Sequence, residues 1–580
     1  MRRLLALRHT VRRHLREDPV AFWLRLWGRK STPGLQRWLR RMDSILAVAP
    51  ASRLGVMTAL LVGDARILRH RLTVALEKAP RGARAKYLAD VSLAGELPAL
   101  GQTFATRMDP AADGGGTTWA KIHWYNGRVS EAINCLREDD ARTRRLRERY
   151  LAEQDVYGRW TPVVEAVPDY EPRERVVLHL LNNSLPYTQT GYTKRSHSLL
   201  SAQHELGWDV HAATRLGYPE TLGILGPSRK HDIDGVRYHR LLSRNGIPNL
   251  RDRLQEEAEQ LLALVLDVRP SVLHTTTHFV NGLVVRAVAE ATGLPWIYEV
   301  RGQLADTWVS KRSPEAATSE RYLDFTRRET DVMLSADLVF TLGHAMRQRI
   351  IGFGVDPARV LLSPNAVGDA YLDMPPPPRV ARSEMGLDPE PLLVGTVSSL
   401  IGYEGIDDLV EAYAILRRER DDVRLKVVGD GPALSELRLQ AAALGLDPHE
   451  VFPGRVSAER AVRYHRAMDV FVVPRKDFAV TRSVTPLKPV EAMATCRPVV
   501  ASDLPALREM VVPGVTGLCV PASDPAALAR AIETLLDDGS QRAAMGRAGR
   551  SVVLETRTWQ RVAELSIARY GQLRAEVVDQ

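Results

Sequence analysis

The chain has 580 residues, a length that accommodates roughly three to five domains of ordinary size, each with its own hydrophobic core. It contains only three widely spaced cysteines, which excludes a disulfide framework or a cysteine-rich zinc site and favours a reducing, cytoplasmic location. Apolar residues make up 45% and charged residues 26%, so the composition excludes a wholly disordered chain, a collagen-like repeat and a polytopic membrane protein.

The net charge of +9 is concentrated at the start of the chain. Residues 1–43 carry twelve arginines and lysines against three acidic residues, an excess that equals the net charge of the whole protein. Apolar side chains recur among these arginines at helical spacing, and the segment also contains Trp23, Trp27 and Trp38. We therefore predict a basic amphipathic leader over residues 1–50.

The leader is open to three interpretations. A basic helix with a tryptophan-bearing apolar face can lie in the headgroup layer of an anionic membrane. It can instead pack on the following domain, or act as a nucleic-acid arm. We favour the membrane surface over packing and predict no nucleic-acid partner. The apolar run Leu4–Leu7 is too short for a secretory signal, and the stretch Ile45–Gly63, interrupted by Pro50 and Arg53, is too short to span a membrane.

Residues 51–160 are rich in Ala, Leu and Arg, which predicts a helical domain. Gly63, Gly95 and Gly127 fall 32 residues apart, and each opens a similar stretch of sequence. This period is close to that of the tetratricopeptide repeat, whose stacked helical hairpins offer a groove to a protein partner. The same spacing can arise in an ordinary helical bundle, and the sequence leaves both interpretations open.

A proline-containing linker over residues 161–173 separates the helices from a different pattern. Short apolar runs now alternate with helical stretches, which predicts a parallel sheet in each of two α/β domains. The predicted strands are 176–181, 210–213, 272–274, 296–300, 338–342 and 360–362 in the first domain, and 393–397, 425–428, 451–452, 470–473, 499–501 and 518–520 in the second.

Four consecutive prolines interrupt the alternation and predict a stiff hinge over residues 375–379. The first Rossmann-like domain then spans residues 174–374, the second spans 380–555, and a final helix occupies 556–580. Two such domains joined by a hinge form a cleft between the carboxyl ends of their strands, where α/β folds bind ligands.

The segment PLKPVEAMATCRPVVASD (Pro486–Asp503) supplies the first candidate binding residues. It places Glu491 at the start of a helix, where free amide groups can receive a phosphate and a carboxylate can accept ribose hydroxyls. Lys488 adds a cation for a diphosphate. Taken alone, a glutamate at this position is more often a partner of the helix dipole, so the neighbouring motifs decide its interpretation.

Those motifs follow one another in a recognisable order. They are YEVRG (Tyr298–Gly302), SPNA (Ser363–Ala366), GTVSSLIGYEGID (Gly395–Asp407), VVGDGP (Val427–Pro432), FPGRVS (Phe452–Ser457) and TPLKPVEAMA. With them, residues 176–570 resemble a retaining glycosyltransferase of family 4, which has the GT-B fold of two Rossmann-like domains facing a cleft. YEVRG, GYEGID and TPLKPVEAMA resemble most closely the branch associated with exopolysaccharides.

The resemblance assigns roles in donor binding. Glu491 would hold the ribose of a nucleotide-diphosphate sugar. The segment of Gly454, Arg455 and Val456 would line the base pocket. Gly429 and Gly431 would let the backbone approach the ligand, although a tight turn after a strand explains such glycines equally well.

Two departures from the family pattern concern charge. Ser399 and Glu404 stand where family 4 enzymes usually carry an arginine and a lysine for the donor diphosphate, and Ser483 stands where the first of two paired glutamates is usual. The cations available as replacements are Arg475, Lys476, Arg482 and Lys488, of which we select Arg475 and Lys488.

In the first α/β domain the resemblance points to three further places. Gly191, with Tyr192, Lys194 and Arg195 beside it, resembles a glycine loop close to the donor phosphate. His278 is a loose match to a catalytic histidine, and a structural histidine is an equal alternative. Glu299 and Arg301 end a strand near the sugar position, where an ion pair that only shapes the loop is the competing interpretation.

The resemblance implies transfer of a hexosyl group from a nucleotide-diphosphate sugar to a glycan or lipid-linked acceptor in cell-envelope or exopolysaccharide synthesis. We predict a cytoplasmic enzyme, peripheral at the inner face of the plasma membrane, with no metal or other cofactor, because no Asp-x-Asp pair stands in a suitable loop. The alternatives are an epimerase or phosphorylase on the same fold, and a catalytically degenerate scaffold that binds a partner through its helices.

Overall fold

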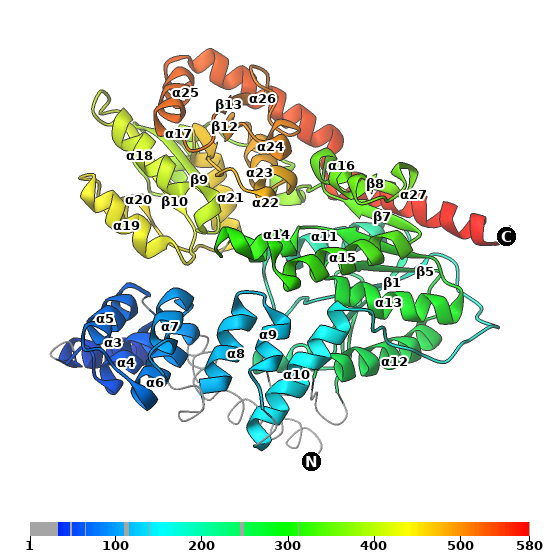
Figure 1. The fold of residues 1–580 in the computed structure, drawn as a ribbon. Helices are drawn as coiled ribbons and strands as arrows, with labels where there is room; N and C mark the ends of the chain where they lie inside the picture. Colours follow the sequence, from blue (N-terminus) through cyan, green and yellow to red (C-terminus); the bar gives the residue numbers. More distant parts are fainter. Residues whose placement is uncertain are drawn as a thin grey trace.

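The computed structural model describes residues 33–578 except 47–48, 64, 109–114, 138–139, 225, 244–248 and 311. Most of the predicted leader, residues 1–32, lies outside the described residues. The described chain forms a helical domain followed by two α/β domains, each built on its own sheet (Figure 1). None of the helices within the described ranges is long and apolar enough to cross a bilayer.

The helical domain confirms the helical character predicted for residues 51–160. Gly63 ends α4 with a φ of 76°, Gly95 follows α6, and Gly127 follows α8 with a φ of 78°. The recurring glycines therefore each separate the two helices of a pair, α4/α5, α6/α7 and α8/α9. The helices are α3 (Pro33–Leu46), α4 (Arg53–Val62), α5 (Ala65–Glu77), α6 (Gly82–Ala94), α7 (Pro98–Ala105), α8 (Gly115–Tyr125), α9 (Val129–Asn134) and α10 (Ala141–Tyr157).

The end of the predicted leader is part of this domain. Residues 33–46 form α3, and the guanidinium of Arg71 on α5 lies 2.7 Å from the carboxylate of Asp43 in a buried ion pair. The same guanidinium donates to the backbone carbonyl of Asp43 at 2.8 Å. For these residues the packing interpretation therefore holds, and the leader boundary predicted at residue 50 falls too late in the chain.

The first α/β domain contains an eight-stranded sheet of order β3-β4-β2-β1-β5-β6-β7-β8, parallel except for the edge pair β3 and β4. Its strands are β1 (Val176–Leu181), β2 (Asp209–Thr214), β3 (Lys230–Ile233), β4 (Val236–Arg240), β5 (Val272–Thr276), β6 (Trp296–Val300), β7 (Leu338–Thr341) and β8 (Val360–Leu362). Its helices are α11 (Gly191–Glu205), α12 (Leu250–Val268), α13 (Phe279–Thr292), α14 (Leu304–Val309), α15 (Glu320–Ser335) and α16 (His344–Gly352). Every residue of β1 is buried, as expected for a strand covered by helices on both faces.

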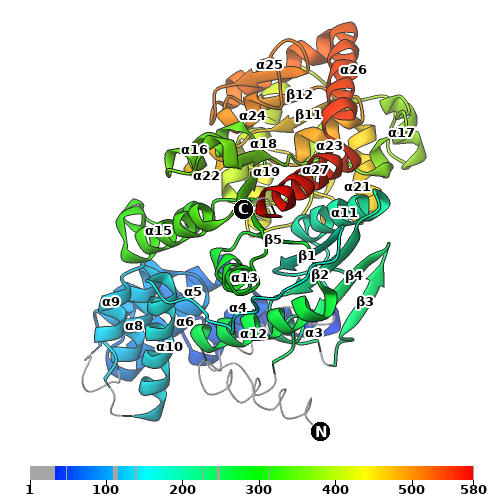
Figure 2. The same cartoon turned by 90° about the vertical axis from the view of Figure 1, so that its right-hand side faces the viewer.

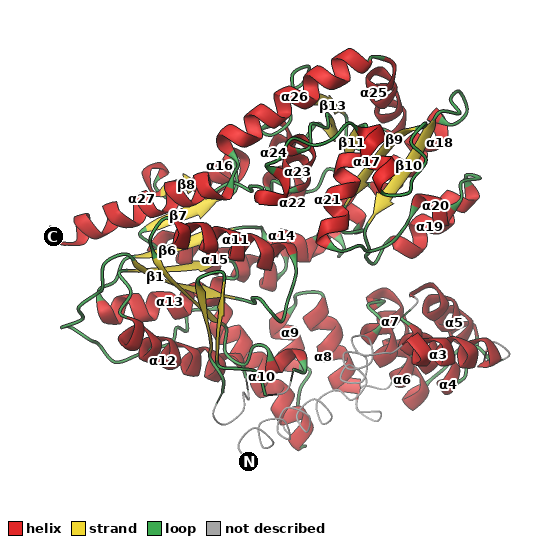
Figure 3. Ribbon diagram, turned by 180° about the vertical axis from the view of Figure 1, so that it is seen from behind, coloured by secondary structure: helices red, strands yellow, loops and turns green. Residues whose placement is uncertain are grey.

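The second α/β domain contains a five-stranded parallel sheet of order β10-β9-β11-β12-β13 (Figure 3). Its strands are β9 (Leu392–Val397), β10 (Val423–Val428), β11 (Val470–Val473), β12 (Val499–Ser502) and β13 (Gly517–Val520). The helices are α17 (Pro378–Glu384), α18 (Ile406–Leu416), α19 (Leu434–Ala443), α20 (Pro448–Val451), α21 (Ala458–Ala467), α22 (Ala479–Ser483), α23 (Lys488–Ala494), α24 (Pro505–Arg508), α25 (Pro525–Asp537) and α26 (Gly539–Thr556). Because α17 begins at Pro378, the hinge is shorter than the predicted 375–379.

Eleven of the twelve predicted strands are present. The strand predicted at 451–452 is wrong: Asp447 caps a short helix with Pro448 in its first turn, and this start signal outweighs the apolar pair that follows. The hairpin of β3 and β4 was not predicted, because β3 is polar and lies at the sheet edge. An Asp-Gly turn with positive φ at Asp234 and Gly235 joins its strands.

The last helix, α27 (Trp559–Val578), returns from the second α/β domain to pack beside α11 of the first (Figures 1 and 2). Its Tyr570 is fully buried, and the phenol oxygen lies 2.6 Å from Nδ1 of His274 and 3.0 Å from Nε2 of Gln203. The predicted C-terminal helix is thus present and closes the apolar face of the first sheet, where Trp559 and Tyr570 join one core cluster.

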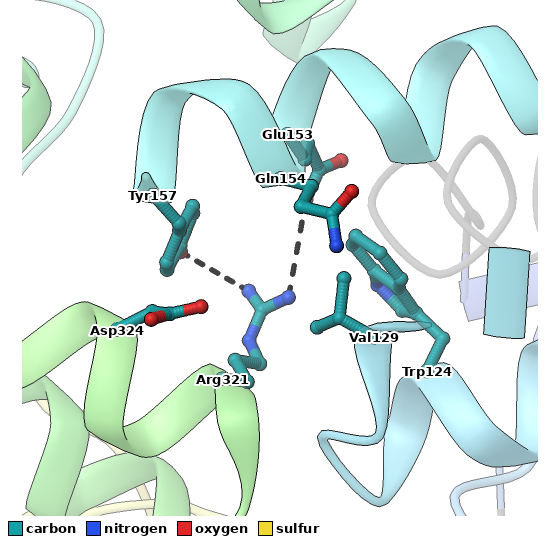
Figure 4. A pocket seen from close by; sticks show the side chains of 7 residues that line it. All are labelled: Trp124, Val129, Glu153, Gln154, Tyr157, Arg321 and Asp324. Atoms are coloured by element: carbon teal, nitrogen blue, oxygen red, sulfur yellow. Dashed lines mark hydrogen bonds and ion pairs between the residues drawn. The ribbon is translucent and has the colours of Figure 1, made fainter. Parts of the chain in front are cut away.

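The helical domain is docked on the first α/β domain through arginines held between aromatic rings. Arg321 of α15 lies over the rings of Trp124 and Tyr157, at 5.4 and 5.1 Å from their centroids, and donates to the Tyr157 hydroxyl at 3.2 Å. These side chains and Glu153 surround a small pocket at the domain junction (Figure 4). Gly127 lies so close to α15 that a Cβ there would be 2.4 Å from the Ser319 hydroxyl.

The predicted linker over residues 161–173 has no regular secondary structure, as expected, but it follows the surface of the first α/β domain. Its backbone amides donate to that domain, from Val167 to Ala291 at 2.7 Å and from Arg173 to Arg269 at 2.8 Å. These bonds fix the path of the connection between the helical and α/β domains.

Candidate active site

The candidate site lies where the start of α23 and the loops after β9 and β11 meet the N-terminal end of α11 from the other domain. Glu491 stands in the first turn of α23 with its side chain 23% exposed, and its carboxylate lies 3.6 Å from Nε2 of the buried His465. Burial raises the pKa of Glu491 to about 7, against the hydrogen bond from Tyr371 and the charges of Lys194 and Lys488. Lys194 belongs to α11, so the two domains face each other at this carboxylate.

Glu404 binds both of the cations that we selected for the donor diphosphate. Its carboxylate lies 2.5 Å from Nζ of Lys488, and two nitrogens of Arg475 lie 3.1 Å from its two oxygens. Burial alone would raise the pKa of Glu404, but the charges of Lys488 and Arg475 hold it at about 2. The resemblance predicts a cation at position 404, and the structure shows instead a carboxylate that ties two other cations together with a net charge of +1.

The remaining candidate cations of this region are also paired. Lys476 forms ion pairs with Asp407 and Asp408, and Arg482 forms an exposed pair with Asp477 at 2.5 Å. Of the cations predicted to replace the missing arginine and lysine, Lys488 and Arg475 are therefore the two that meet at one carboxylate, that of Glu404.

Gly429 and Gly431 are explained by packing within the protein. A Cβ at Gly429 would lie 1.8 Å from the carbonyl oxygen of Ser398, and one at Gly431 would lie 2.2 Å from that of Leu400. The loops after β9 and β10 thus touch through backbone atoms, which requires glycine at both positions. This geometry supports the alternative of a tight turn, and the approach of the backbone to a ligand stays a prediction. Gly405, which the prediction did not single out, has the same function against the carbonyl of Pro474.

Gly191 and Gly454 differ from these loop glycines. No atom lies within 4 Å of a Cβ built at either position, so packing within the protein does not demand glycine there. Gly454 has a φ of 86° and its carbonyl accepts from the amide of Gly429, which holds its loop at the end of β10. Arg455 is exposed beside it, and Val456 packs against the domain core. The space at Gly191 and Gly454 is compatible with close approach of a ligand.

Glu299 and Arg301 form a buried ion cluster rather than a surface of the cleft. Glu299 is completely buried between Arg195, at 2.5 Å, and Arg301, also at 2.5 Å. Burial opposes ionisation, but Arg301 and Arg195 outweigh it and hold the pKa of Glu299 well below its usual range. This geometry favours the competing interpretation, an ion pair that shapes the loop, over the catalytic role predicted for both residues.

His278 is placed as a structural residue. It is the N-cap of α13, where Nδ1 accepts from the amide of Val280 at 3.4 Å, and its ring packs between Phe279 and Phe325. Burial lowers the pKa of His278 to about 3, so the imidazole is neutral at physiological pH. The structure therefore supports the structural alternative over the predicted catalytic one.

The SPNA motif contains a residue that sequence reasoning missed. Asn365 accepts from Arg195 at 3.0 Å and donates from Nδ2 to the carbonyl of Thr485 at 2.9 Å. Because Thr485 opens the TPLK element, this bond joins the two α/β domains directly beside Lys488. The motif itself was the available signal, but its bridging function depends on contacts between residues 120 positions apart.

Ser399 and Ser483, the two serines that depart from the family pattern, have different environments. Ser399 is exposed, whereas Ser483 is buried and its hydroxyl donates to the carbonyl of Ala479 within α22. Within the described ranges no group of three His, Cys, Asp or Glu side chains is arranged to hold a metal ion.

The chain matches two families of transferase domains. Residues 190–366 match the glycosyl transferase 4-like domain, and residues 379–552 match glycosyl transferases group 1. The GDP-mannose-dependent alpha-(1-6)-phosphatidylinositol monomannoside mannosyltransferase of Mycolicibacterium smegmatis is 34% identical over 241 residues, which cover 40% of this chain and 63% of that relative, less than two thirds of its length. The D-inositol 3-phosphate glycosyltransferase of Pseudarthrobacter chlorophenolicus is 27% identical over 383 residues, covering 64% of this chain and 88% of the relative.

A solved structure supports the architecture. Sucrose-phosphate synthase from Thermosynechococcus elongatus superimposes with a TM-score of 0.57 and 23% identity, over 69% of this chain and 99% of that one. The two sheets and this likeness show the GT-B fold, in which two Rossmann-like domains face each other. More particularly, the two α/β domains of this chain are similar to the two domains that glycosyltransferases of the GT4 type carry in this order.

Proposed function

We propose that the protein transfers a hexosyl group, with retention of anomeric configuration, from a nucleotide-diphosphate sugar to a glycan or lipid-linked acceptor. The observation that carries the proposal is the position of Glu491 at the start of α23, beside Lys488 and under the charge of Lys194 from the opposite domain. A carboxylate there suits ribose hydroxyls, and the flanking cations suit a diphosphate.

The proposed chemistry follows from that arrangement. As the bond between the sugar C1 and the phosphate breaks, negative charge accumulates on the leaving diphosphate, and preorganised cations lower the energy of that state. Lys488 is the nearest such cation on α23, with Arg475 behind it. Gly191 at the start of α11 and the segment Gly454–Val456 would approach the phosphate and the base. We propose that this chemistry needs no metal ion, and activity that survives excess chelator would support it, whereas a strict divalent-ion requirement would exclude it.

The relatives suggest the acceptor class. The M. smegmatis relative is named for action on a phosphatidylinositol mannoside, and a Streptococcus pneumoniae relative is an alpha-monoglucosyldiacylglycerol synthase, 26% identical over 250 residues. We infer a lipid-linked or glycan acceptor of the cell envelope, in exopolysaccharide synthesis or a related pathway, reached at the inner face of the membrane. The basic residues 1–32 would contact anionic lipid there. Deletion of residues 1–32 should then weaken binding to anionic liposomes while sparing donor hydrolysis, and unchanged binding would exclude this role.

A thermal-shift panel of UDP, GDP and ADP tests donor binding. A ligand that binds the native state raises its melting temperature by mass action. We expect one nucleotide to raise the melting temperature of the wild-type protein. The same nucleotide should bind the Glu491→Ala variant at least tenfold more weakly and so raise its melting temperature less. If no nucleotide or nucleotide sugar shifts either protein, donor binding is excluded.

The second candidate is a catalytically degenerate scaffold whose helical domain binds a protein partner. The observation that favours it is the pairing of Arg475 and Lys488 with Glu404, which leaves the candidate site with little free positive charge. Nucleotide binding without any hydrolysis or transfer would support this candidate over the enzyme.

A further inference from the structure

Glu404 is positioned to act on the donor site through another residue. It ends a single 3₁₀ turn after β9 (Gly402–Glu404), and Gly405 next to it adopts a φ of 68° against the carbonyl of Pro474. This turn directs the carboxylate beneath the start of α23. The side chains of Glu404, Arg475 and Lys488 are 6%, 8% and 15% exposed, so the three charges interact with little screening by solvent.

The two cations held by Glu404 have different environments. Arg475 is fixed on a second side, because it also donates to the carbonyl of Val484 at 2.8 Å, and a guanidinium stays charged at any physiological pH. Lys488 is the more exposed of the two and opens the helix that carries Glu491. Lys488 is therefore the more accessible of the two cations to a ligand at the start of α23, and its charge depends on its surroundings.

Four influences decide the protonation of Lys488. Burial lowers the pKa of Lys488, as does the neighbouring charge of Arg475, whereas Glu404 and Glu491 raise it. Glu491 is itself half-protonated near neutral pH and is faced by Lys194 and Tyr371. Glu404, ionised throughout the physiological range, is the dominant group that keeps the ammonium charged.

We propose that Glu404 is a positioning residue that keeps Lys488 protonated and fixed at the start of α23 for the diphosphate of the donor. The identity of the ligand rests on the proposed function, whereas the state of Lys488 does not. Glu404 thus replaces the cation of related enzymes indirectly, by holding a lysine of another element in the charged form.

The test measures binding of the nucleoside diphosphate that stabilises the wild type, by calorimetry between pH 8 and 10.5. Binding should weaken as Lys488 loses its proton. Glu404→Gln keeps the shape of the side chain and removes its charge. In this variant the pH at which half of the affinity is lost (the midpoint) should fall by about one unit or more, which corresponds to a tenfold change in the proton affinity of Lys488. In Lys488→Arg the affinity should not fall between pH 8 and 10.5, because arginine does not titrate in this range.

A matched control and a second charge-conserving variant complete the design. Asp477→Asn removes a carboxylate from the exposed pair with Arg482 on the neighbouring loop and should leave the midpoint unchanged. Glu404→Asp retains the charge and should keep the midpoint near that of the wild type. An unchanged midpoint in Glu404→Gln, or an equal loss of affinity at every pH, would overturn the proposal.

A second measurement separates this inference from the proposed function. The pH dependence of Lys488 acylation by acetic anhydride, followed by mass spectrometry without nucleotide, reports the protonation of Lys488 directly. Its midpoint should fall by about one unit in Glu404→Gln. If no nucleotide binds but this midpoint moves, the proposed function fails and the hold of Glu404 on Lys488 stands. If the acylation midpoint stays, the inference fails whatever binds.

Discussion

At the scale of single residues, the candidate site places a carboxylate where it is costly to ionise. Glu491 is largely buried at the start of α23, and its pKa of about 7 lies well above the usual value of 4.5. A group whose pKa rises on folding favours the native state when it is protonated. The protonated carboxyl therefore makes its full contribution to the free energy of unfolding below pH 4.5. This contribution falls as the pH rises to about 7 and is absent above that pH. A function that needs this charge explains why the cost is tolerated.

We predict that Glu491→Gln raises stability and abolishes donor binding. The shift of the pKa from 4.5 to about 7 corresponds to about 3 kcal/mol at most. The variant should therefore resist urea better than the wild type at pH 8, by roughly 1–3 kcal/mol, and equally at pH 4. Its affinity for the nucleotide should fall at least tenfold.

Urea denaturation at the two pH values measures the effect, with the exposed Glu555→Gln as a control that should change neither property. Equal stability of Glu491→Gln and wild type at pH 8 would contradict the account of this residue.

At the scale of elements, the first domain depends on contacts that the sequence could not indicate. The strands and the TPLK helix were predicted from local pattern, because a buried parallel strand and a helix start leave clear signals. The functions of Asn365 and Glu404 could not be predicted, since each depends on partners more than 60 residues away. For Glu299 the sequence offered the ion pair with Arg301 as an alternative, but not its second partner, Arg195. His278 shows the same limit, because only the packing of Phe279 and Phe325 identifies it as a capping residue.

The helix α27 provides a test at this scale. Tyr570 joins the helix to the sheet through its hydroxyl, which contacts His274 and Gln203 in a fully buried position. We predict that Tyr570→Phe lowers the free energy of unfolding by about 1–3 kcal/mol, because it leaves buried polar atoms without a partner.

Chemical denaturation measures this loss, and Tyr87→Phe is the matched control. The Tyr87 hydroxyl donates to the carbonyl of Arg53 at an exposed site, so its removal should cost less than half as much. A Tyr570→Phe variant as stable as the control would show that α27 is held by apolar packing alone.

At the scale of the whole molecule, the helical domain and the transferase unit form one docked assembly. The aromatic residues Trp124 and Tyr157 enclose Arg321, and the irregular residues 161–173 are hydrogen-bonded along the first α/β domain. The sequence predicted the three domains, but it presented residues 161–173 as a linker. The docking depends on complementary surfaces of two domains, which no local pattern records.

Gly127 offers a direct test of the docking. Gly127→Val should separate the helical domain from α15, because its side chain would meet Ser319 and Trp308. Gly63→Val is the matched control: Gly63 has nearly the same φ, 76° against 78°, and a Cβ there has no neighbour within 4 Å. Both variants incur the strain of the left-handed conformation, roughly 1–2 kcal/mol.

Limited proteolysis of residues 158–173 should be at least several-fold faster in Gly127→Val than in Gly63→Val. Equal rates in the two variants would show that strain, and not the contact with α15, governs the junction.

The central claim is that the cleft beside Glu491 binds and cleaves a nucleotide-diphosphate sugar. The most direct measurement is hydrolysis of a panel of UDP- and GDP-sugars by the wild type and by Glu491→Ala, in excess chelator. The account predicts that the wild type cleaves at least one donor and that the variant is about a hundredfold slower, the loss expected when a charged contact to the substrate is removed. Equal and negligible rates for both proteins would contradict it and favour the scaffold.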